Sequence, residues 1–69
     1  MPENTYKMIE LTGTSAHSIE DAIAKALSTA RKLEKNLRWF VVTETRGAIN
    51  DDKVAEYQVT IKVGCRSDP

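Results

Sequence analysis

The sequence predicts an α+β fold in which a small sheet carries one helix on one of its faces. Three observations support this class: an alternating apolar pattern near the N-terminus, a helical apolar spacing in the middle, and two further alternating segments around a short polar turn. The predicted order is strand, helix, strand, strand. We expect residues 1–69 to form a single domain, because no repeat, linker or low-complexity stretch divides them.

The first predicted strand covers residues 5–13, TYKMIELTG, and ends at Gly13. Its alternation places Lys7, Ile9 and Leu11 on one side. The opposite side carries Tyr6, Met8, Glu10 and Thr12.

The predicted helix covers residues 18–36, SIEDAIAKALSTARKLEKN. Its apolar residues recur at three- and four-residue intervals, which is typical of an amphipathic helix of four to five turns: Ile19, Ala22, Ile23, Ala26, Leu27, Ala30 and Leu33. Ser18 is placed to cap the N-terminus, with acidic residues in the first turn and basic residues near the end. Asn36 is the expected stop.

Two further strands, residues 37–47 and 53–64, are separated by AINDD, whose Asn and Asp residues favour a turn. They therefore form a predicted antiparallel hairpin. In the last strand the apolar alternation indicates which residues face the helix: Tyr57, Val59, Ile61 and Val63.

Trp39 is the single tryptophan, and its face depends on the register of this hairpin. A turn centred between residues 50 and 51 pairs Phe40 with Ile61, Val42 with Val59, and Trp39 with Lys62. Trp39 then lies on the face away from the helix. The same face is expected to hold Val41, Thr43, Thr45, Gln58 and Thr60.

A large aromatic ring on an open sheet face needs a cover. Another subunit could supply it, or the indole could be a stacking platform for a flat aromatic ligand. Gln58 offers an amide donor and acceptor side by side, which match the edge of a heterocycle. In the predicted register Gln58 lies opposite Thr43, about 13 Å from Trp39. A single ligand that touches both is expected to span two subunits.

The size of the chain points to self-association. A domain of 69 residues buries only about 60% of the surface that its unfolded chain exposes. Cys65 is the single cysteine and His17 the single histidine, so neither an intrachain disulfide nor a zinc-ligand pattern is available. Oligomerisation remains as the expected source of stability.

Charge and hydropathy exclude several classes of function. Ten basic and ten acidic residues are interspersed, so the basic footprint of a nucleic-acid-binding protein is absent. We expect no membrane association, because no apolar run is long enough to span a bilayer and the N-terminus lacks the apolar core of a signal peptide. The unpaired cysteine favours a reducing cytoplasm. No acid–base constellation is evident, and Glu44 and Glu56 are interpreted as solvated charges near the hairpin end.

The segments MIELTGTS, AIAKAL, LRWFVVTETRG and YQVTIKVG, with the spacings between them, resemble the dodecins, small flavoproteins of bacteria and archaea. The resemblance covers residues 6–66. It implies a strand-helix-strand-strand subunit whose three-stranded antiparallel sheet wraps one amphipathic helix, with twelve copies assembled into a hollow shell. Such a homododecamer would answer the stability problem raised by the length of the chain.

The resemblance also implies a ligand. Dodecins bind flavins as pairs stacked between symmetry-related tryptophans, here Trp39 and its mate, and the glutamine that matches Gln58 bonds the isoalloxazine edge. Members that prefer FMN use arginines that match Arg46 and Arg66 on the phosphate side. Thr45 and Thr60, on the same predicted face, complete the expected cofactor-binding set.

Two departures from the family pattern stand near these residues. Cys65 replaces an aromatic residue that is common in bacterial relatives, and Arg38 replaces an acidic residue before the tryptophan. Cys65 is expected to be a small buried residue. His17 is expected to lie exposed in a loop.

The resulting hypothesis is a protein that stores FMN or riboflavin and quenches its photochemistry. It is not expected to be an enzyme, since a flavin pressed between two indoles has no open face for a substrate. The alternative is a structural shell or interaction protein without flavin. Some bacterial relatives bind coenzyme A, for which Lys7 and Arg31 are weak candidates.

Overall fold

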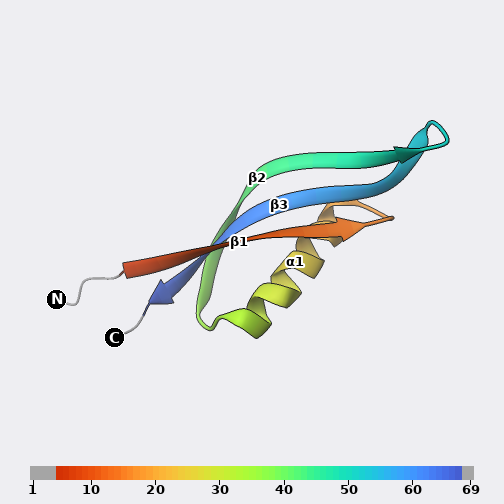
Figure 1. Ribbon diagram of the computed structural model, residues 1–69. Coiled ribbons are helices and arrows are strands. Elements are labelled where there is room, and N and C mark those ends of the chain that lie inside the picture. Colours follow the sequence, from red (N-terminus) through yellow and green to blue (C-terminus); the bar gives the residue numbers. More distant parts are fainter. Residues whose placement is uncertain (1–4, 68–69) are drawn as a thin grey trace.

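A computed structural model describes residues 5–67 and confirms the predicted fold class (Figure 1). The elements follow the order β1, α1, β2, β3, and the three antiparallel strands lie in the spatial order β1-β3-β2. Their bounds are Thr5–Ser15 for β1, Ile19–Leu33 for α1, Leu37–Asn50 for β2 and Lys53–Ser67 for β3. The last strand in the sequence is thus the central strand of the sheet, and α1 crosses one face of it.

The helix begins where the sequence predicts and ends earlier. The Ser18 side chain accepts a hydrogen bond from the Asp21 backbone N–H at 2.9 Å, which confirms Ser18 as the N-cap. The last helical residue is Leu33 and the C-cap is Glu34, so the prediction that α1 continues to Asn36 is wrong. Asn36 instead adopts a positive φ of 60° in the connection to β2, where its carbonyl accepts a bond from the Arg66 N–H.

The core lies between α1 and the helix-facing side of β3. Its buried members are 0–3% exposed: Ala22, Ala26, Ala30, Val59, Ile61, Val63 and Cys65. The predicted alternation of β3 is confirmed for Val59, Ile61 and Val63, while Tyr57 is only half-buried. Small alanines on the helix allow it to approach the sheet closely. Gly13 serves the same close packing, since a Cβ there would lie 2.0 Å from the Ala22 carbonyl oxygen.

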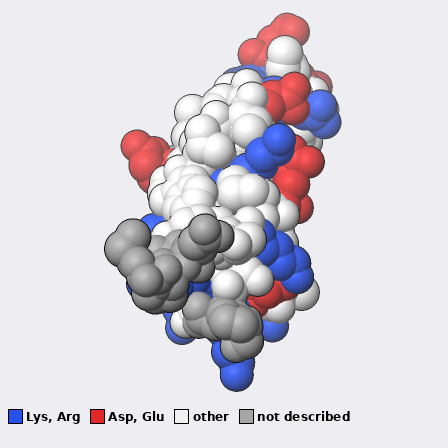
Figure 2. Space-filling model, turned by 90° about the vertical axis from the view of Figure 1, so that its left-hand side faces the viewer, with Lys and Arg blue, Asp and Glu red and all other residues white. Residues whose placement is uncertain are grey.

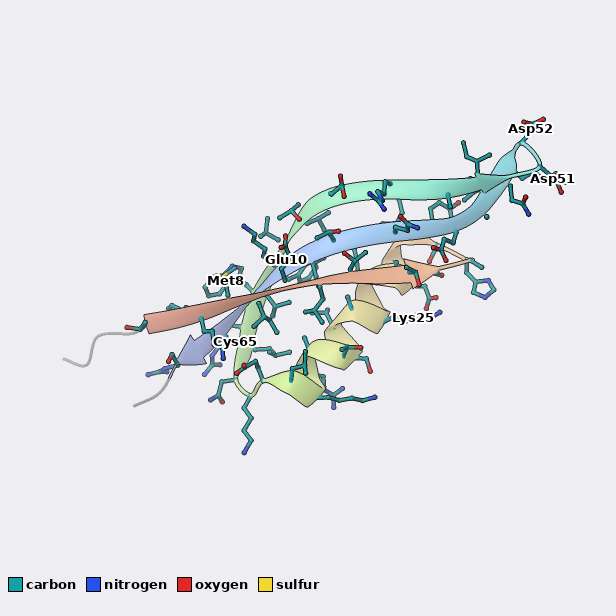
Figure 3. All side chains as sticks on the ribbon, in the orientation of Figure 1. Met8, Glu10, Lys25, Asp51, Asp52 and Cys65 are labelled. Atoms are coloured by element: carbon teal, nitrogen blue, oxygen red, sulfur yellow. The ribbon has the colours of Figure 1, made fainter. Side chains whose placement is uncertain are left out.

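The hairpin register differs from the predicted one by two residues. The turn consists of Asp51 and Asp52, with positive φ values of 53° and 61°, whereas Asn50 remains in the strand and pairs with Lys53 (Figure 3). Positive φ at both central residues is the pattern of a type I′ turn, which the short polar side chain of aspartate tolerates. The observed pairs are Phe40 with Val63, Val42 with Ile61, and Trp39 with Gly64.

A bulge at Thr43 changes the side of the sheet on which the following residues of β2 lie. The register shifts between Val42 and Glu44, so Thr45 pairs with Val59 and lies on the helix-side face of the sheet. The prediction that Thr45 shares the face of Trp39 is therefore wrong, because the regular alternation stops at the bulge. Glu44 and Arg46 take that face instead, opposite Thr60 and Gln58.

The β2–β3 hairpin extends well beyond the helix as an arm (Figure 1). None of the residues of β2 is buried in the single chain. Its apolar side chains are exposed on both faces, with Trp39 and Val41 on one and Phe40 and Val42 on the other. This is far more exposed apolar surface than a small monomer usually tolerates.

Candidate ligand-binding face

The face of the sheet opposite α1 carries a row of exposed aromatic and apolar side chains at one end. Its large members are 41–47% exposed: Tyr6, Met8, Trp39 and Val41. Figure 2 shows a band of uncharged side chains bordered by charged ones on the end of the molecule that it presents. An aromatic surface of this kind can cover a flat ligand or another subunit.

Trp39 lies flat against the sheet because of the residue beneath it. Its partner on β3 is Gly64, and a Cβ at that position would lie 2.5–2.6 Å from three carbon atoms of the indole six-membered ring. The Tyr6 and Trp39 rings form a T-shaped pair, with 4.9 Å between the ring centroids and 69° between the planes. One face of the indole thus rests on the backbone of β3, and the side chain remains 44% exposed for a stacking partner.

A hydrogen-bonded cluster occupies the same face farther along the arm. Arg46 Nε donates to Gln58 Oε1 at 2.6 Å, and Gln58 Nε2 donates to Glu56 Oε2 at 2.8 Å. Arg46 Nη1 also lies 3.9 Å from Glu44 Oε1. The interpretation of Glu56 as simply a solvated charge is therefore wrong, because its carboxylate holds the Gln58 amide.

Hydroxyl groups lie between the aromatic end and the polar cluster. The Thr60 and Thr12 hydroxyls are hydrogen-bonded at 2.8 Å, and the Thr43 hydroxyl donates to the Thr60 carbonyl oxygen at 3.2 Å. Thr60 thus shares the face of Trp39 and Gln58, as predicted, whereas Thr45 does not.

Trp39 and Gln58 are farther apart than the predicted register implied. Gly64, beneath Trp39, is six residues from Gln58 along β3. At the rise of an extended strand this separation is about 20 Å, which replaces the earlier value of 13 Å. One planar ligand that touches an indole and a Gln58 amide must therefore draw the two groups from different copies of the chain.

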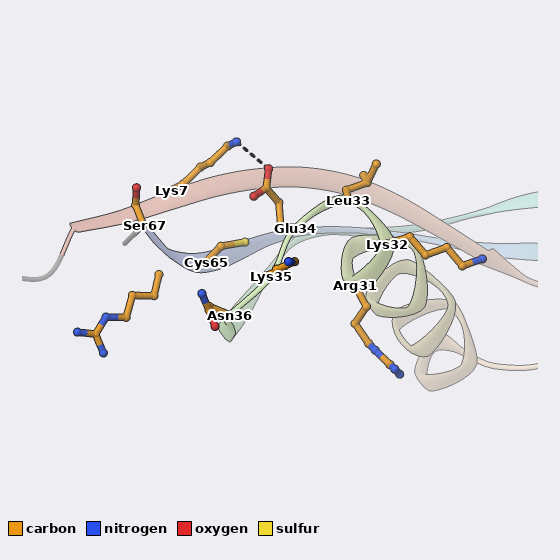
Figure 4. A pocket seen from close by; sticks show the side chains of 10 residues that line it. Lys7, Arg31, Lys32, Leu33, Glu34, Lys35, Asn36, Cys65 and Ser67 are labelled. Atoms are coloured by element: carbon orange, nitrogen blue, oxygen red, sulfur yellow. Dashed lines mark hydrogen bonds and ion pairs between the residues drawn. The ribbon is translucent and has the colours of Figure 1, made fainter. Parts of the chain in front are cut away.

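Arg66 belongs to a different hollow, at the C-terminal end of α1 (Figure 4). This cavity of about 450 Å³ has five basic lining residues, namely Lys7, Arg31, Lys32, Lys35 and Arg66, beside the carboxylate of Glu34. Lys7 Nζ donates to Glu34 Oε2 at 2.6 Å. That bond and the attraction of the carboxylate raise the pKa of the Lys7 ammonium above its ordinary value.

Cys65 and His17 lie as predicted. Cys65 is 1% exposed, and burial raises the pKa of its thiol, so it is a small core residue. His17 is exposed between β1 and α1. Within residues 5–67, no three histidine, cysteine or acidic side chains gather in a group that could hold a metal ion. No helix in the same range is long and apolar enough to cross a membrane.

Comparison with known proteins agrees with this fold. The dodecin family model matches residues 5–68. A dodecin of Thermus thermophilus is 51% identical over 61 residues, which cover 88% of each chain. A solved structure of a Thermus thermophilus protein superposes with a TM-score of 0.93 at 46% identity, covering 97% of this chain and 98% of that one. The dodecin of Streptomyces coelicolor gives a TM-score of 0.93 at 38% identity, with coverage of 100% and 99%.

Two further results concern particular relatives. Solved structures of the Thermus thermophilus dodecin include one variant with a tryptophan replaced by phenylalanine and two in which different arginines are replaced by alanine. A calcium dodecin of Mycobacterium tuberculosis, described as having a calcium-binding site, is 32% identical with a TM-score of 0.80, covering 94% of this chain and 93% of that one.

These comparisons and the large exposed apolar surfaces define the class of protein. It is a small-molecule-binding protein of the dodecin type, which assembles from several copies. The chain belongs to the dodecin family.

The sequence alone did not reveal three residues that shape this face. Tyr6 and Gly64 fix the position of the Trp39 indole, and Glu56 fixes that of the Gln58 amide. A signal was available for Gly64, since a glycine within a strand often marks a close approach of another group. No comparable signal identified Glu56, because its role depends on the register.

Proposed function

We propose that this protein binds FMN or riboflavin, stores it and quenches its photochemistry, as a homododecamer in the cytoplasm. The position of the Trp39 indole is the observation that supports this proposal most directly. Its indole lies against Gly64 and the residue is 44% exposed in the single chain, which leaves aromatic surface on which an isoalloxazine ring can stack.

Residues from neighbouring copies would complete each site. Because Trp39 and Gln58 are about 20 Å apart in one chain, the ring stacked on one indole is read by the Gln58 amide of another copy. The spacing of residues supports the set: Trp39, Arg46 and Arg66 are 7 and 20 residues apart, as are the replaced tryptophan and arginines of the Thermus thermophilus dodecin.

The other residues of the expected cofactor-binding set differ in how directly they face the ligand. Arg46 uses Nε for Gln58 and has Nη1 at 3.9 Å from Glu44, a long ion pair that a phosphate would replace in this proposal. Arg66 lies in the basic cavity. Thr60 offers a hydroxyl on the ligand face, while Thr45 could contribute only from the opposite face. No chemical turnover is required, since a ring sandwiched between two indoles exposes no face to a second substrate.

Coenzyme A is a second candidate ligand, for which the basic cavity is the specific observation. Lys7 and Arg31, the residues considered for it from the sequence, both line this cavity with three further basic side chains. A dinucleotide-like ligand with several phosphates suits such a surface. Titration with coenzyme A, followed calorimetrically, should then show binding that Lys7→Ala and Arg31→Ala weaken and Trp39→Ala leaves unchanged.

The flavin proposal is tested by adding FMN to the ligand-stripped protein while flavin fluorescence and, by light scattering, the molecular mass are followed. We expect strong quenching that saturates near one flavin per chain on a dodecamer. Trp39→Ala should abolish tight binding while the oligomer persists. Val42→Ala, which removes an exposed apolar side chain of the same strand from the helix-side face, is the matched control and should still quench. Unchanged flavin affinity in the Trp39 variant would exclude the platform, and unquenched FMN on an intact wild-type oligomer would favour a shell without flavin.

A further inference from the structure

The Gln58 amide is held at both ends within its own chain. Its carbonyl oxygen accepts from Arg46 Nε at 2.6 Å, and its amino group donates to the Glu56 carboxylate at 2.8 Å. Gln58 and Glu56 are half-buried and lie on the same face of β3. Both contacts involve an ionised partner, which makes them stronger than bonds between neutral groups.

These two partners permit only one orientation of the amide. A guanidinium group has donors and no acceptor, whereas a carboxylate has acceptors and no donor. If the amide turned by 180°, its amino group would face the Arg46 N–H and its oxygen would face the Glu56 oxygen. Both contacts would then be repulsive, so the pair of charges fixes which end of Gln58 is the acceptor.

The fixed amide still has one free acceptor position and one free donor. A planar amide carries two lone pairs on oxygen and two N–H groups, of which one each is used internally. The outward pair therefore presents an acceptor and a donor in a set order. An isoalloxazine ring offers a complementary pattern only at its pyrimidine edge, where the N3–H stands between two carbonyls.

We infer that Glu56 is a positioning residue that fixes the order of donor and acceptor on Gln58, and so makes the site selective for rings with an N–H beside a carbonyl at the bound edge. The inference rests on the proposed function and deepens it. Glu44 provides a contrast, because its carboxylate lies 3.9 Å from Arg46 Nη1, whereas the Glu56 carboxylate lies 2.8 Å from the Gln58 amide nitrogen.

The experiment compares riboflavin with 3-methylriboflavin, in which a methyl group replaces the N3 hydrogen and the stacking surface is otherwise kept. Dissociation constants are measured by fluorescence quenching on the assembled wild-type protein, on Glu56→Gln and on the control Glu44→Gln. We expect the wild type and Glu44→Gln to prefer riboflavin by roughly tenfold, the size of one lost hydrogen bond. Glu56→Gln removes the charge that anchors the amino group and leaves Arg46 alone to hold the amide, so the preference should fall below about threefold.

The ratio of the two constants separates positioning from a merely structural role, which would weaken both ligands equally. An unchanged preference in Glu56→Gln overturns the inference, as does a wild type that binds both flavins equally well, although flavin binding then stands. A wild type that binds neither flavin overturns the proposed function and this inference with it. If Glu56→Gln fails to assemble, Glu56→Asp takes its place, since a carboxylate shortened by one methylene should also reduce the preference.

Discussion

The two faces of β3 have opposite characters although they alternate along one strand. On the helix side, Val59, Ile61 and Val63 are 0–1% exposed against the alanines of α1. On the other side, polar residues alternate along the strand as far as Gly64, which lies beneath an indole that is 44% exposed. The first face is completed within a single chain, whereas the second acquires its cover only from ligands or other copies. Two glycines, Gly13 and Gly64, allow this difference to be tested with the same substitution.

Gly13→Ala should have the largest effect, because it separates the helix from the sheet. The new methyl group would stand 2.0 Å from the Ala22 carbonyl oxygen and 3.0 Å from the Ala26 Cβ, so backbone must move. We expect the free energy of unfolding to fall by about 3 kcal/mol or more, measured by urea denaturation. Thr14→Ala, at the exposed neighbouring position, is the control. Equal stability of the two variants would show that the covered face is not closely packed at Gly13.

Gly64→Ala should leave the subunit folded and damage only the open face. The methyl group would stand 2.5–2.6 Å from the indole carbons, and a side chain at the surface can turn away. We expect a change of less than about 1 kcal/mol in the free energy of unfolding. The tilted indole should weaken FMN binding roughly tenfold, the equivalent of about 1.4 kcal/mol of stacking. Full FMN affinity in this variant would mean that the flat position of Trp39 is unimportant.

Local patterns predicted the covered face well and the open face only in part. The Ser18 cap, the alanine stripe and the alternation of β3 each depend on neighbouring residues, and the structure confirms them. The register depends on which two residues form the turn, and Asn50 was as plausible a turn residue as Asp52. The bulge at Thr43 leaves no clear mark in a run of β-branched residues, so the face of Thr45 was wrong.

The turn at the end of the arm offers a smaller change that should affect neither face. Asp51 and Asp52 both have positive φ, which costs free energy for a residue with a side chain. Replacing them together by Asn and Gly supplies the pair that type I′ turns prefer. We expect a gain of about 0.5–1 kcal/mol in thermal unfolding experiments, with FMN affinity unchanged. A loss of stability would show that the aspartate side chains hold the turn.

The smallest expected effect is a loss of stability at low pH, caused by protonation of Asp21 in α1. The Ser15 hydroxyl donates to Asp21 at 2.6 Å and Lys25 lies 3.3 Å away, and both lower the pKa of the Asp21 carboxyl below 3.8. This contribution to stability is present above the pKa of the unfolded chain and is lost as pH falls through the lower folded value. Melting temperatures of the wild type should therefore exceed those of Asp21→Asn at pH 6, and the difference should shrink below about pH 3.8. A difference that is constant with pH would contradict the assignment.

The bulge at Thr43 has a consequence for how this segment can vary in length. Trp39 and Arg46 are seven residues apart, an odd interval that would place them on opposite sides of an unbroken strand. The extra residue restores them to a common side. Deleting Thr43 would make this interval even, so a regular strand without the bulge would keep Glu44 and Arg46 on the side of Trp39. Deletion of Thr43 should thus be tolerated better than deletion of two residues between Trp39 and Arg46, since their partners Gly64 and Gln58 are six residues apart on β3 and β2 must span the same interval.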